Sequence, residues 1–515
     1  MKILTACLAL ALLAPPAFAQ PADGDPADGS AEAANQSPPR SIHLSELLDV
    51  IVQENPELAR TAVDVSIANA TALQAEGIDD WQLSATGLWA SMRHDVVAGN
   101  PFQITADDSL SMQGELSRAL PTGGTVDLKL KGGWAATTYA IVLAPGSSMN
   151  ADSTLYQGSL IASVTQPLLA GSGRKVARAQ QRRARLARDA ATLQREIAAT
   201  TAVQQVISGY WELAFADRTL EIRKQSLDLA REQLRITRLA IGQKVAAPTE
   251  ALAIEQAIAV REQAVLAAEI QRSEQSLTLR RLVGLEIGPG KIDLTAADLP
   301  KAVPAQLDLD KALARAREQN PRLALARLQE KTAAVDVDVA ADAMRPHLDA
   351  AASIGPDASS NGVGDTLEQM GTLSSFSATA SLTYRQSLGN RGARGADAAA
   401  RGRVSQAKLD AATLQRDLSV EVVRAMNLLR AASKRIEVAN VAIELAEKNL
   451  DNEKVLFQAG ESRSFDVLAR QDELAQAKLS MERARVDQQA ALTGLEALTG
   501  DLLGRYGVSA ELTAK

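Results

Sequence analysis

The feature that most limits the fold of this chain is a helical pattern that continues over residues 175–240. A helix of that length would measure roughly 100 Å at ~1.5 Å per residue. The hydrocarbon core of a bilayer is only ~30 Å thick, and the faces of this helix are polar, so the helix must extend through water. The sequence predicts further helices at 44–78, 250–283, 309–344, 395–457 and 466–499.

Two series of apolar residues, each with a spacing of seven, follow this longest helix. The first series is Leu213, Leu220, Leu227, Leu234 and Ile241, and the second is Phe215, Ile222, Leu229 and Ile236. Their offset of two residues is about 200° around a helix. A single seam is typical of a paired coiled coil, whereas two opposed seams indicate a buried contact on each side. Helices arranged in this way can form a closed cylinder with a polar inner face, and the alternative is a solid bundle.

The sequence contains an internal repeat. Asn55-Pro56-Glu57-Leu58 recurs as Asn320-Pro321-Arg322-Leu323, and other short matches follow in the same order in both halves. The second half also carries the heptad series, Val422, Leu429, Ile436, Ile443, Leu450 and Phe457, with a weaker series at Ala431, Val438 and Leu445. Each half therefore predicts a helix, a β region and a long helical hairpin.

The β regions are predicted from alternating apolar and small or polar residues. The first half has candidates at 82–93, 109–120, 125–134 and 159–169, with a long loop before the last, and the second half has candidates at 347–354 and 375–386. Such strands fit the wall of a transmembrane β-barrel, or a soluble sheet that caps the helices. Four to six strands are too few to enclose an aqueous pore, since porins use ~16, so a pore would require several chains.

The N-terminus predicts export from the cytoplasm. Lys2, an apolar run at 3–13 and the A-x-A site Ala17-Phe18-Ala19 form a signal peptide with cleavage after Ala19. Cys7 is the only cysteine and lies inside that peptide, so the mature chain has neither disulfides nor thiolate chemistry. Residues 20–40 contain little to bury and are predicted to be a disordered tail.

The composition argues against catalysis and against nucleic acid. The net charge is −7 and only 3% of residues are aromatic, which suits close-packed long helices. None of the three histidines is spaced for a metal site, and no nucleophile motif is present, so we predict no catalytic residues, no metal and no cofactor. A basic run is interpreted as a solvated helix face close to lipid headgroups: Arg174, Lys175, Arg178, Arg182, Arg183, Arg185 and Arg188.

Three sequence features together resemble the outer membrane efflux protein family, the TolC-like channels. They are the duplicated Asn-Pro-x-Leu helices, the strand ending Gln166-Pro167-Leu168-Leu169 before Gly171-Ser172-Gly173-Arg174, and the segment from Gly460 to Asp466-Val467-Leu468. The resemblance covers nearly all of residues 41–505. It implies a mainly α-helical trimer, with a hollow helical barrel in the periplasm and one shared transmembrane β-barrel in the outer membrane.

The resemblance also implies partners and a role. Such a channel is a passive conduit of a tripartite efflux or type I secretion system, working with a periplasmic adaptor protein and an inner-membrane transporter. It contacts outer-membrane lipid and no nucleic acid. From the residues alone, the alternative is a periplasmic coiled-coil scaffold protein with a soluble sheet cap.

Residue roles carried over from the family lie at the ends of the helical hairpins. Arg238, Leu239, Gly242 and Gly460 are candidates for docking the adaptor, with both glycines expected to allow positive φ at the turns. Asp466 is a candidate for an acidic ring at the constriction, or for a helix cap. Phe457 is a second constriction candidate.

The expected domain organisation follows the repeat. It comprises a signal peptide (1–19), an N-terminal tail (20–40), a first repeat (41–285, with strands at 80–169), a linker (286–306), a second repeat (307–505, with strands at 346–387) and a C-terminal tail (506–515). The first repeat has an additional strand pair near 109–134, which could widen the barrel or project outward.

Overall fold

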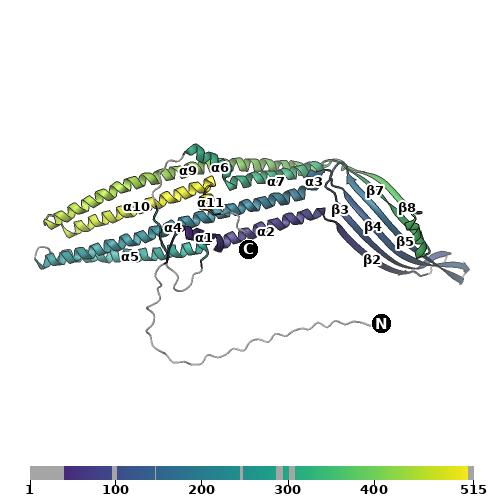
Figure 1. Ribbon diagram of the computed structural model, residues 1–515, viewed down its shortest axis with the longest axis horizontal. Coiled ribbons are helices and arrows are strands. Elements are labelled where there is room, and N and C mark those ends of the chain that lie inside the picture. The colour runs from purple at the N-terminus through teal and green to yellow at the C-terminus, as the bar shows by residue number, and fades with distance from the viewer. Residues whose placement is uncertain are drawn as a thin grey trace, which may run out of the picture.

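The computed structural model describes residues 40–95, 101–144, 147–243, 247–285, 294–300 and 308–508. The molecule is elongated, with helical hairpins at one end and a curved sheet at the other (Figure 1). The predicted signal peptide, nearly all of the N-terminal tail, and parts of the linker and C-terminal tail lie outside the described residues.

Among the described residues, the first half contains five strands, several shorter helices and a long helical hairpin. These are β1 (Arg40–Ile42), α1 (Leu44–Glu54), α2 (Pro56–Glu76), η1 (Gly77–Asp79), β2 (Gln82–Arg93), β3 (Phe102–Ala119), β4 (Thr125–Ala144), β5 (Ser147–Pro167), α3 (Arg174–Ala177), α4 (Ala179–Gly242) and α5 (Pro248–Val283).

Among the described residues, the second half has one short separate strand and two strands of the large sheet, with an extra helix between these two. Its elements are β6 (Leu294–Ala296), α6 (Leu309–Gln319), α7 (Pro321–Ala343), β7 (His347–Ser360), α8 (Val363–Gly371), β8 (Phe376–Arg385), α9 (Arg391–Gln458), α10 (Ser464–Thr499) and α11 (Leu502–Arg505).

The first helix of each half is divided at its Asn-Pro pair, where the sequence predicted one continuous helix. Asn55 accepts hydrogen bonds from the N–H groups of Glu57 and Leu58, both at 3.0 Å, and so caps α2. Asn320 caps α7 in the same way. The proline that follows each asparagine suits the first turn of a helix and disfavours helical geometry in the residue before it.

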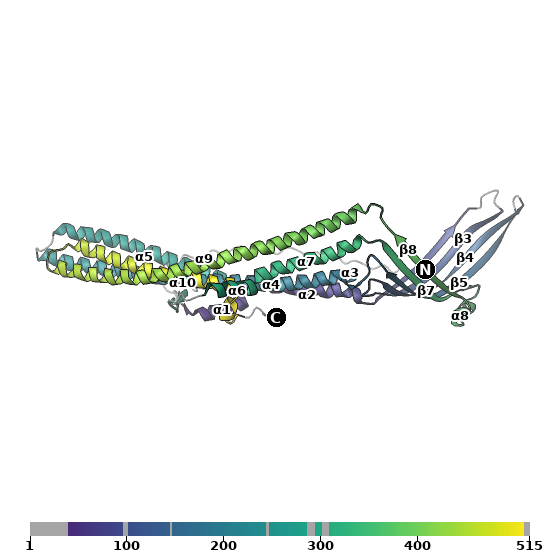
Figure 2. The ribbon, with the colours of Figure 1, turned by 90° about the horizontal axis from the view of Figure 1, so that it is seen from above.

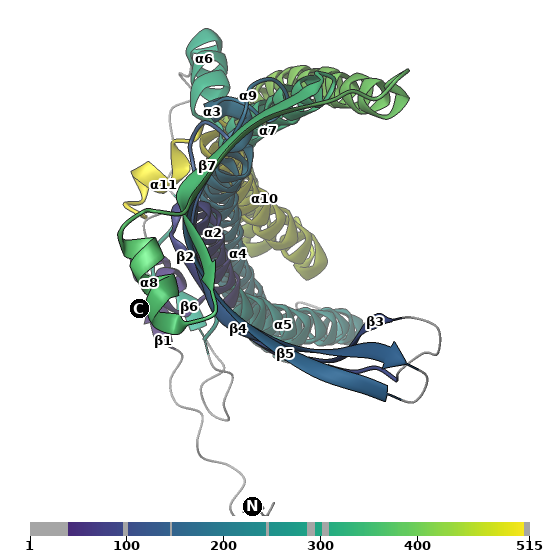
Figure 3. The same ribbon diagram turned by 90° about the vertical axis from the view of Figure 1, so that its right-hand side faces the viewer.

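The four longest helices lie side by side in an arc (Figures 2 and 3). In the half that is distant from the sheet, α4 lies between α5 and α10, and α10 lies between α4 and α9. Nearer the sheet, α2 and α7 pack along α4, and α7 also packs on α9. The end helices of the arc are therefore α5 and α9.

One of the two predicted seams on α4 is buried within the chain. Leu213, Leu220 and Leu227 are at most 7% exposed, and the last two pack against α5. The prediction that the second seam is also buried is wrong for part of its length, since Leu229 is 45% and Ile236 is 37% exposed. Smaller residues of α4, including Ala230 and Thr237, contact α10 instead.

The different burial of the two seams predicts different losses of folding stability when an aspartate is introduced on each. Leu227→Asp should destabilise the chain by about 3 kcal/mol or more, because it removes a buried leucine and buries a charge. Leu229→Asp should cost about 1 kcal/mol or less, because that side chain already contacts solvent. Thermal unfolding followed by circular dichroism would compare the melting temperatures of the two variants. Equal decreases would contradict the assignment of Leu227 to a buried seam and of Leu229 to an exposed one.

The large sheet has the strand order β2-β3-β4-β5-β7-β8, with every neighbouring pair antiparallel. The strands β4 and β5 are longer than predicted, because residues 135–144 pair with residues 147–155, which were expected to form a loop. Strand β3 is longer as well, because residues 102–108 pair with this extension of β4. The strand pair near 109–134 is thus part of one continuous sheet. Helix α8 was not predicted from the sequence.

A small parallel sheet joins the segment before α1 to the segment that follows α5. Its strands are β1 and β6, which pair from Arg40 with Leu294 to Ile42 with Ala296. Arg40, which was expected in the disordered tail, and residues 294–296, which were expected in the linker, thus form strands. Val508, which was expected in the C-terminal tail, is also buried in the core beneath these strands, around Tyr210.

Candidate channel surfaces

The two faces of the large sheet differ in chemistry. Side chains of directly paired residues in an antiparallel sheet share a face, and successive residues alternate between faces. On one face lie exposed apolar residues from all six strands: Leu83, Met112, Leu128, Leu130, Leu160, Val164, Ile354 and Leu382. The other face is mostly polar, with an ion pair of 3.3 Å between Lys129 and Glu115 and a hydrogen bond of 2.6 Å between Ser353 and Thr379.

The apolar face is the convex one. Gly158 of β5 pairs with Gly132 of β4 and alternates in phase with Leu130 and Leu160, so it belongs to the apolar face. A Cβ atom on Gly158 would lie 2.5 Å from the Sδ of Met370 in α8, so α8 covers this face. Figure 3 shows α8 on the convex side of the arc. The polar face therefore lines the concave side.

The arc ends in unpaired edges on both sides. In the described residues, β2 and β8 each pair with a single neighbour, so the sheet is open. The end helices carry apolar residues that are well exposed, among them Leu252, Leu266 and Ile270 on α5 and Val438, Val441 and Leu445 on α9. The last group includes Val438 and Leu445 of the weaker heptad series of the second half. Each side of the arc thus presents a sheet edge and an apolar helix face.

The docking candidates lie at the tips of the two hairpins, distant from the sheet (Figure 1). Leu239 is 56% exposed near the end of α4, while the neighbouring Arg238 forms an ion pair of 2.6 Å with Glu255 of α5. Gly460 has a φ of +78° just after α9, as expected. The expectation for Gly242 is wrong, because Gly242 is the last residue of α4 and has no positive φ.

The two constriction candidates lie on either side of the second turn. Asp466 is exposed in the first turn of α10, where its carboxylate accepts a hydrogen bond of 3.3 Å from the N–H of Arg463. It therefore stabilises the start of the helix. Phe457 is partly buried in the last turn of α9. Phe465, which the sequence analysis did not single out, is 64% exposed beside Asp466.

Part of the basic run holds helices together, which corrects its interpretation as a solvated face at those positions, while Arg174, Lys175 and Arg188 are exposed as expected. Arg178 is buried and pairs with Asp79, and Arg185 pairs with Glu76 of α2 at 2.8 Å. The ion pairs to α7 are Arg182 with Asp338 at 2.9 Å and Arg183 with Asp336 at 2.6 Å. These pairs fix α2 and α7 on α4 just below the sheet.

A hydrogen-bond network that the sequence analysis missed joins β1, β6 and α4. Asp298 accepts hydrogen bonds from the buried Tyr210 hydroxyl at 2.9 Å and from the N–H of Leu44 at 3.0 Å, and it lies 3.0 Å from Nδ1 of His43. The hydrogen bond and charge of Asp298 raise the pKa of His43 above its usual value. Burial alone would raise the pKa of Asp298, but these hydrogen bonds lower it overall.

This network predicts a pH-dependent stability. Because the pKa of His43 is raised in the folded state, its contribution is complete below the unfolded-state pKa of ~6.5 and is lost as pH rises through the folded-state value. His43→Gln should therefore lower the melting temperature more at pH 5.5 than at pH 8.5. The difference should be small, since the imidazole is largely exposed. A larger decrease in melting temperature at pH 8.5 than at pH 5.5 would contradict stabilisation by protonated His43 beside Asp298.

The described residues contain neither a cluster of three potential metal ligands nor a helix that is long and apolar enough to cross a membrane.

Comparison with known proteins supports the resemblance. Residues 312–501 match the family model for outer membrane efflux proteins, while no curated protein matches the chain. A membrane protein from Pseudomonas aeruginosa is similar in structure with 16% identity, 94% and 96% of the two chains covered and a TM-score of 0.64. The outer membrane protein VceC of Vibrio cholerae has 15% identity, coverages of 89% and 96%, and a TM-score of 0.63.

The Campylobacter jejuni CmeC outer membrane channel is similar with 11% identity, 89% and 86% coverage and a TM-score of 0.62. At these identities the structural comparisons establish the fold, and the family model adds the sequence evidence. The family consists of outer-membrane channels and not of enzymes, which agrees with the compartment and class predicted from sequence. Residues 312–501 therefore resemble the outer membrane efflux protein family in sequence, and most of the chain shares the fold of the solved structures named above.

Proposed function

We propose that three copies of this chain form one continuous tube that crosses the outer membrane and extends into the periplasm. The observation that carries this proposal is the two-faced sheet, whose exposed apolar residues lie on the convex side and whose polar residues lie on the concave side. A convex apolar face suits lipid, and a concave polar face suits a water-filled lumen. An exposed apolar surface of this extent would be a liability for a soluble scaffold.

The edges of the arc support a closed ring. One side carries β2 and α5, and the other carries β8 and α9. If β8 of one copy pairs with β2 of the next, the exposed apolar faces of α9 and α5 meet as well. This is a head-to-tail contact, which generates a ring when the rotation closes. Three copies of a six-stranded sheet give eighteen strands, within the range of barrels that enclose an aqueous channel.

The position of the aromatic residues supports the membrane placement. Trp89, Trp134 and Tyr156 lie at one level across the sheet, through the pairs Trp89–Leu110, Leu110–Trp134 and Trp134–Tyr156. Trp81 lies at the other end of β2, where Arg118 covers its ring. The strand rises roughly 27 Å between Trp81 and Trp89 at ~3.4 Å per residue. Because barrel strands are tilted by ~35–45°, this rise spans about 20 Å along the membrane normal, which is of the same order as the ~25 Å apolar band between aromatic girdles.

The conduit is passive and serves a tripartite efflux or type I secretion system. The periplasmic adaptor docks at the hairpin tips around Arg238, Leu239, Gly242 and Gly460, and an inner-membrane transporter supplies the energy. Exposed Leu239 favours such docking. Asp466 and Phe457 line the constriction in this proposal, so that three copies of Asp466 favour cations.

The repeat organisation is also part of the proposal, with residues 41–285 and 307–505 as duplicated units. Asn55 and Asn320 support it, because each caps the following helix and donates a hydrogen bond to the end of a hairpin helix. The acceptors are the carbonyl oxygens of Leu282 in α5, at 2.8 Å, and Leu498 in α10, at 3.0 Å.

Conductance in planar lipid bilayers tests the channel and its constriction together. The wild-type protein should form water-filled, cation-preferring channels. Asp466→Asn should weaken the cation preference while retaining an oxygen acceptor for the N–H of Arg463. Asp466→Glu keeps the charge and should keep the preference. The absence of conductance from inserted protein would refute the channel, and unchanged selectivity of Asp466→Asn would refute the constriction role.

A further inference from the structure

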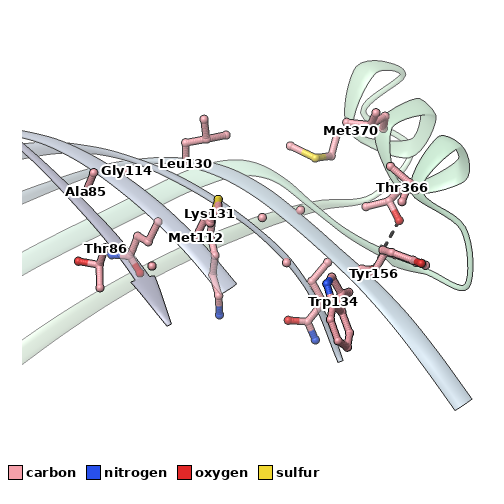
Figure 4. A pocket seen from close by; sticks show the side chains of 18 residues that line it. Ala85, Thr86, Met112, Gly114, Leu130, Lys131, Trp134, Tyr156, Thr366 and Met370 are labelled. Carbon is pink, nitrogen blue, oxygen red and sulfur yellow. Dashed lines mark hydrogen bonds between the residues drawn. The ribbon is translucent and has the colours of Figure 1, made fainter. Parts of the chain in front are cut away.

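A pocket of about 730 Å³ lies between α8 and strands β2 to β5 (Figure 4). Its volume is within the range of small-molecule sites, ~300–1,000 Å³. Figure 4 shows Leu130 on the side of the sheet that faces Met370, while Lys131 points to the opposite side. The pocket therefore opens on the apolar, convex face and not on the lumen.

Helix α8 is firmly attached above one end of this pocket. The hydroxyl of Thr366, which is 4% exposed, donates a hydrogen bond of 2.9 Å to Gly362 O and lies 2.8 Å from Oγ of Ser360. It also approaches the carbonyl oxygen of Tyr156 at 3.5 Å. Met370 reaches the backbone of Gly158, where an added Cβ atom would lie 2.5 Å from its Sδ and would displace the Met370 side chain. The helix thus forms a fixed wall of the pocket.

The pocket owes its depth to missing side chains next to large apolar ones. A Cβ atom at Gly87 or Gly114 would have no heavy atom within 4 Å, and one at Gly132 would have only a backbone oxygen at 4.0 Å. Met112, Leu130 and the side chains of α8 surround this open floor. An apolar hollow loses dispersion contacts unless an apolar group fills it.

We propose that this pocket binds an acyl chain of a membrane lipid, and this inference rests on the proposed membrane placement of the sheet. Cargo in the lumen cannot reach the convex face, so the occupant comes from the surrounding bilayer. An acyl chain needs no hydrogen-bond partner and can bend along a curved floor. The row of Trp89, Trp134 and Tyr156 lies beside the pocket, which places the bound lipid near one boundary of the apolar band.

The charges of α8 indicate which headgroup accompanies the chain. Asp365 and Glu368 are both exposed on this helix. These carboxylates repel a purely anionic headgroup and attract an ammonium group. We therefore choose phosphatidylethanolamine as the probe, with phosphatidylglycerol as the anionic comparison.

Native mass spectrometry of the purified assembly with added phosphatidylethanolamine tests the pocket. Wild-type protein should retain one lipid per chain. Gly114→Leu and Gly132→Leu place an isobutyl group in the hollow, and excluding even two methylenes from burial should weaken binding about tenfold or more. Ala162→Leu is the matched control, because Ala162 pairs with Leu128 on the same face but does not line the pocket.

The outcomes separate this inference from the proposed function. Insertion of each variant into lipid vesicles is measured first. If wild-type protein inserts but retains no lipid, or if Ala162→Leu loses lipid as much as Gly114→Leu, the pocket is not a lipid site although the membrane placement stands. If wild-type protein does not insert, the membrane placement and the lipid site are both refuted. Tighter retention of phosphatidylglycerol would overturn the headgroup assignment.

Discussion

A chain with Leu445→Asp should fold normally and remain monomeric. Leu445 lies on the exposed apolar face of α9, at one end of the arc, and is 55% exposed in the single chain. A carboxylate there therefore costs little in the folded monomer. In the proposed ring the same position would be buried against α5 of the next copy, where an unpaired charge costs several kcal/mol. That cost recurs at each of the three contacts.

Size-exclusion chromatography with light scattering would measure this loss of assembly, and circular dichroism would confirm that the helices are retained. Leu266→Asp on the opposite end helix, α5, should have the same effect. Leu229→Asp is the control, because Leu229 is similarly exposed but belongs to α4, which lies inside the arc between α5 and α10. Normal trimer yield from both edge variants would rule out the proposed contact.

Ile354→Arg should prevent stable insertion into the membrane, whereas Ser353→Arg should permit it. The two residues are adjacent on β7 and point to opposite faces of the sheet. Arginine on the lipid face of a barrel costs ~2–4 kcal/mol near the midplane of the bilayer. At position 353 it would point into the lumen, with the loss of one hydrogen bond to Thr379. That loss is about 1 kcal/mol.

The inserted fraction after folding into vesicles, separated from free protein by flotation, would compare these variants. Ile354→Leu serves as the conservative control and should insert as well as wild type. If Ser353→Arg fails and Ile354→Arg inserts, the assignment of the convex and concave faces is reversed.

The sequence predicted the long helices well because their apolar residues recur over many turns. It placed Leu213, Leu220 and Leu227 correctly on a buried seam, since heptad spacing directly reports a packed helix face. It misplaced Leu229, because periodicity shows that a face is apolar but not whether another helix packs on that face. The strand ends were missed for a different reason. Residues 135–144 and 147–158 are rich in small and polar residues, and their pairing depends on strands elsewhere in the chain.

The candidate surfaces were predictable to a lesser degree. The tips could be located, since Gly460 follows the last turn of a long helix, but Gly242 was given a backbone geometry that α4 does not adopt. The network of His43, Asp298 and Tyr210 could not be found from sequence, because it joins segments up to 255 positions apart. Helix α8 is too short for its periodicity to be recognised. Its packing on the sheet depends on Gly158, and only the strand register shows that Gly158 lies beneath it.

The two unlike sides of the arc have a consequence for mixtures of normal and altered subunits. A chain with Leu445→Asp has lost its α9 contact but keeps an intact α5 face, so it can still accept one neighbour. It would then terminate a growing arc that nothing can complete. Co-expression of such a chain should lower the yield of complete tubes by more than its share of the subunits, as a dominant-negative allele does.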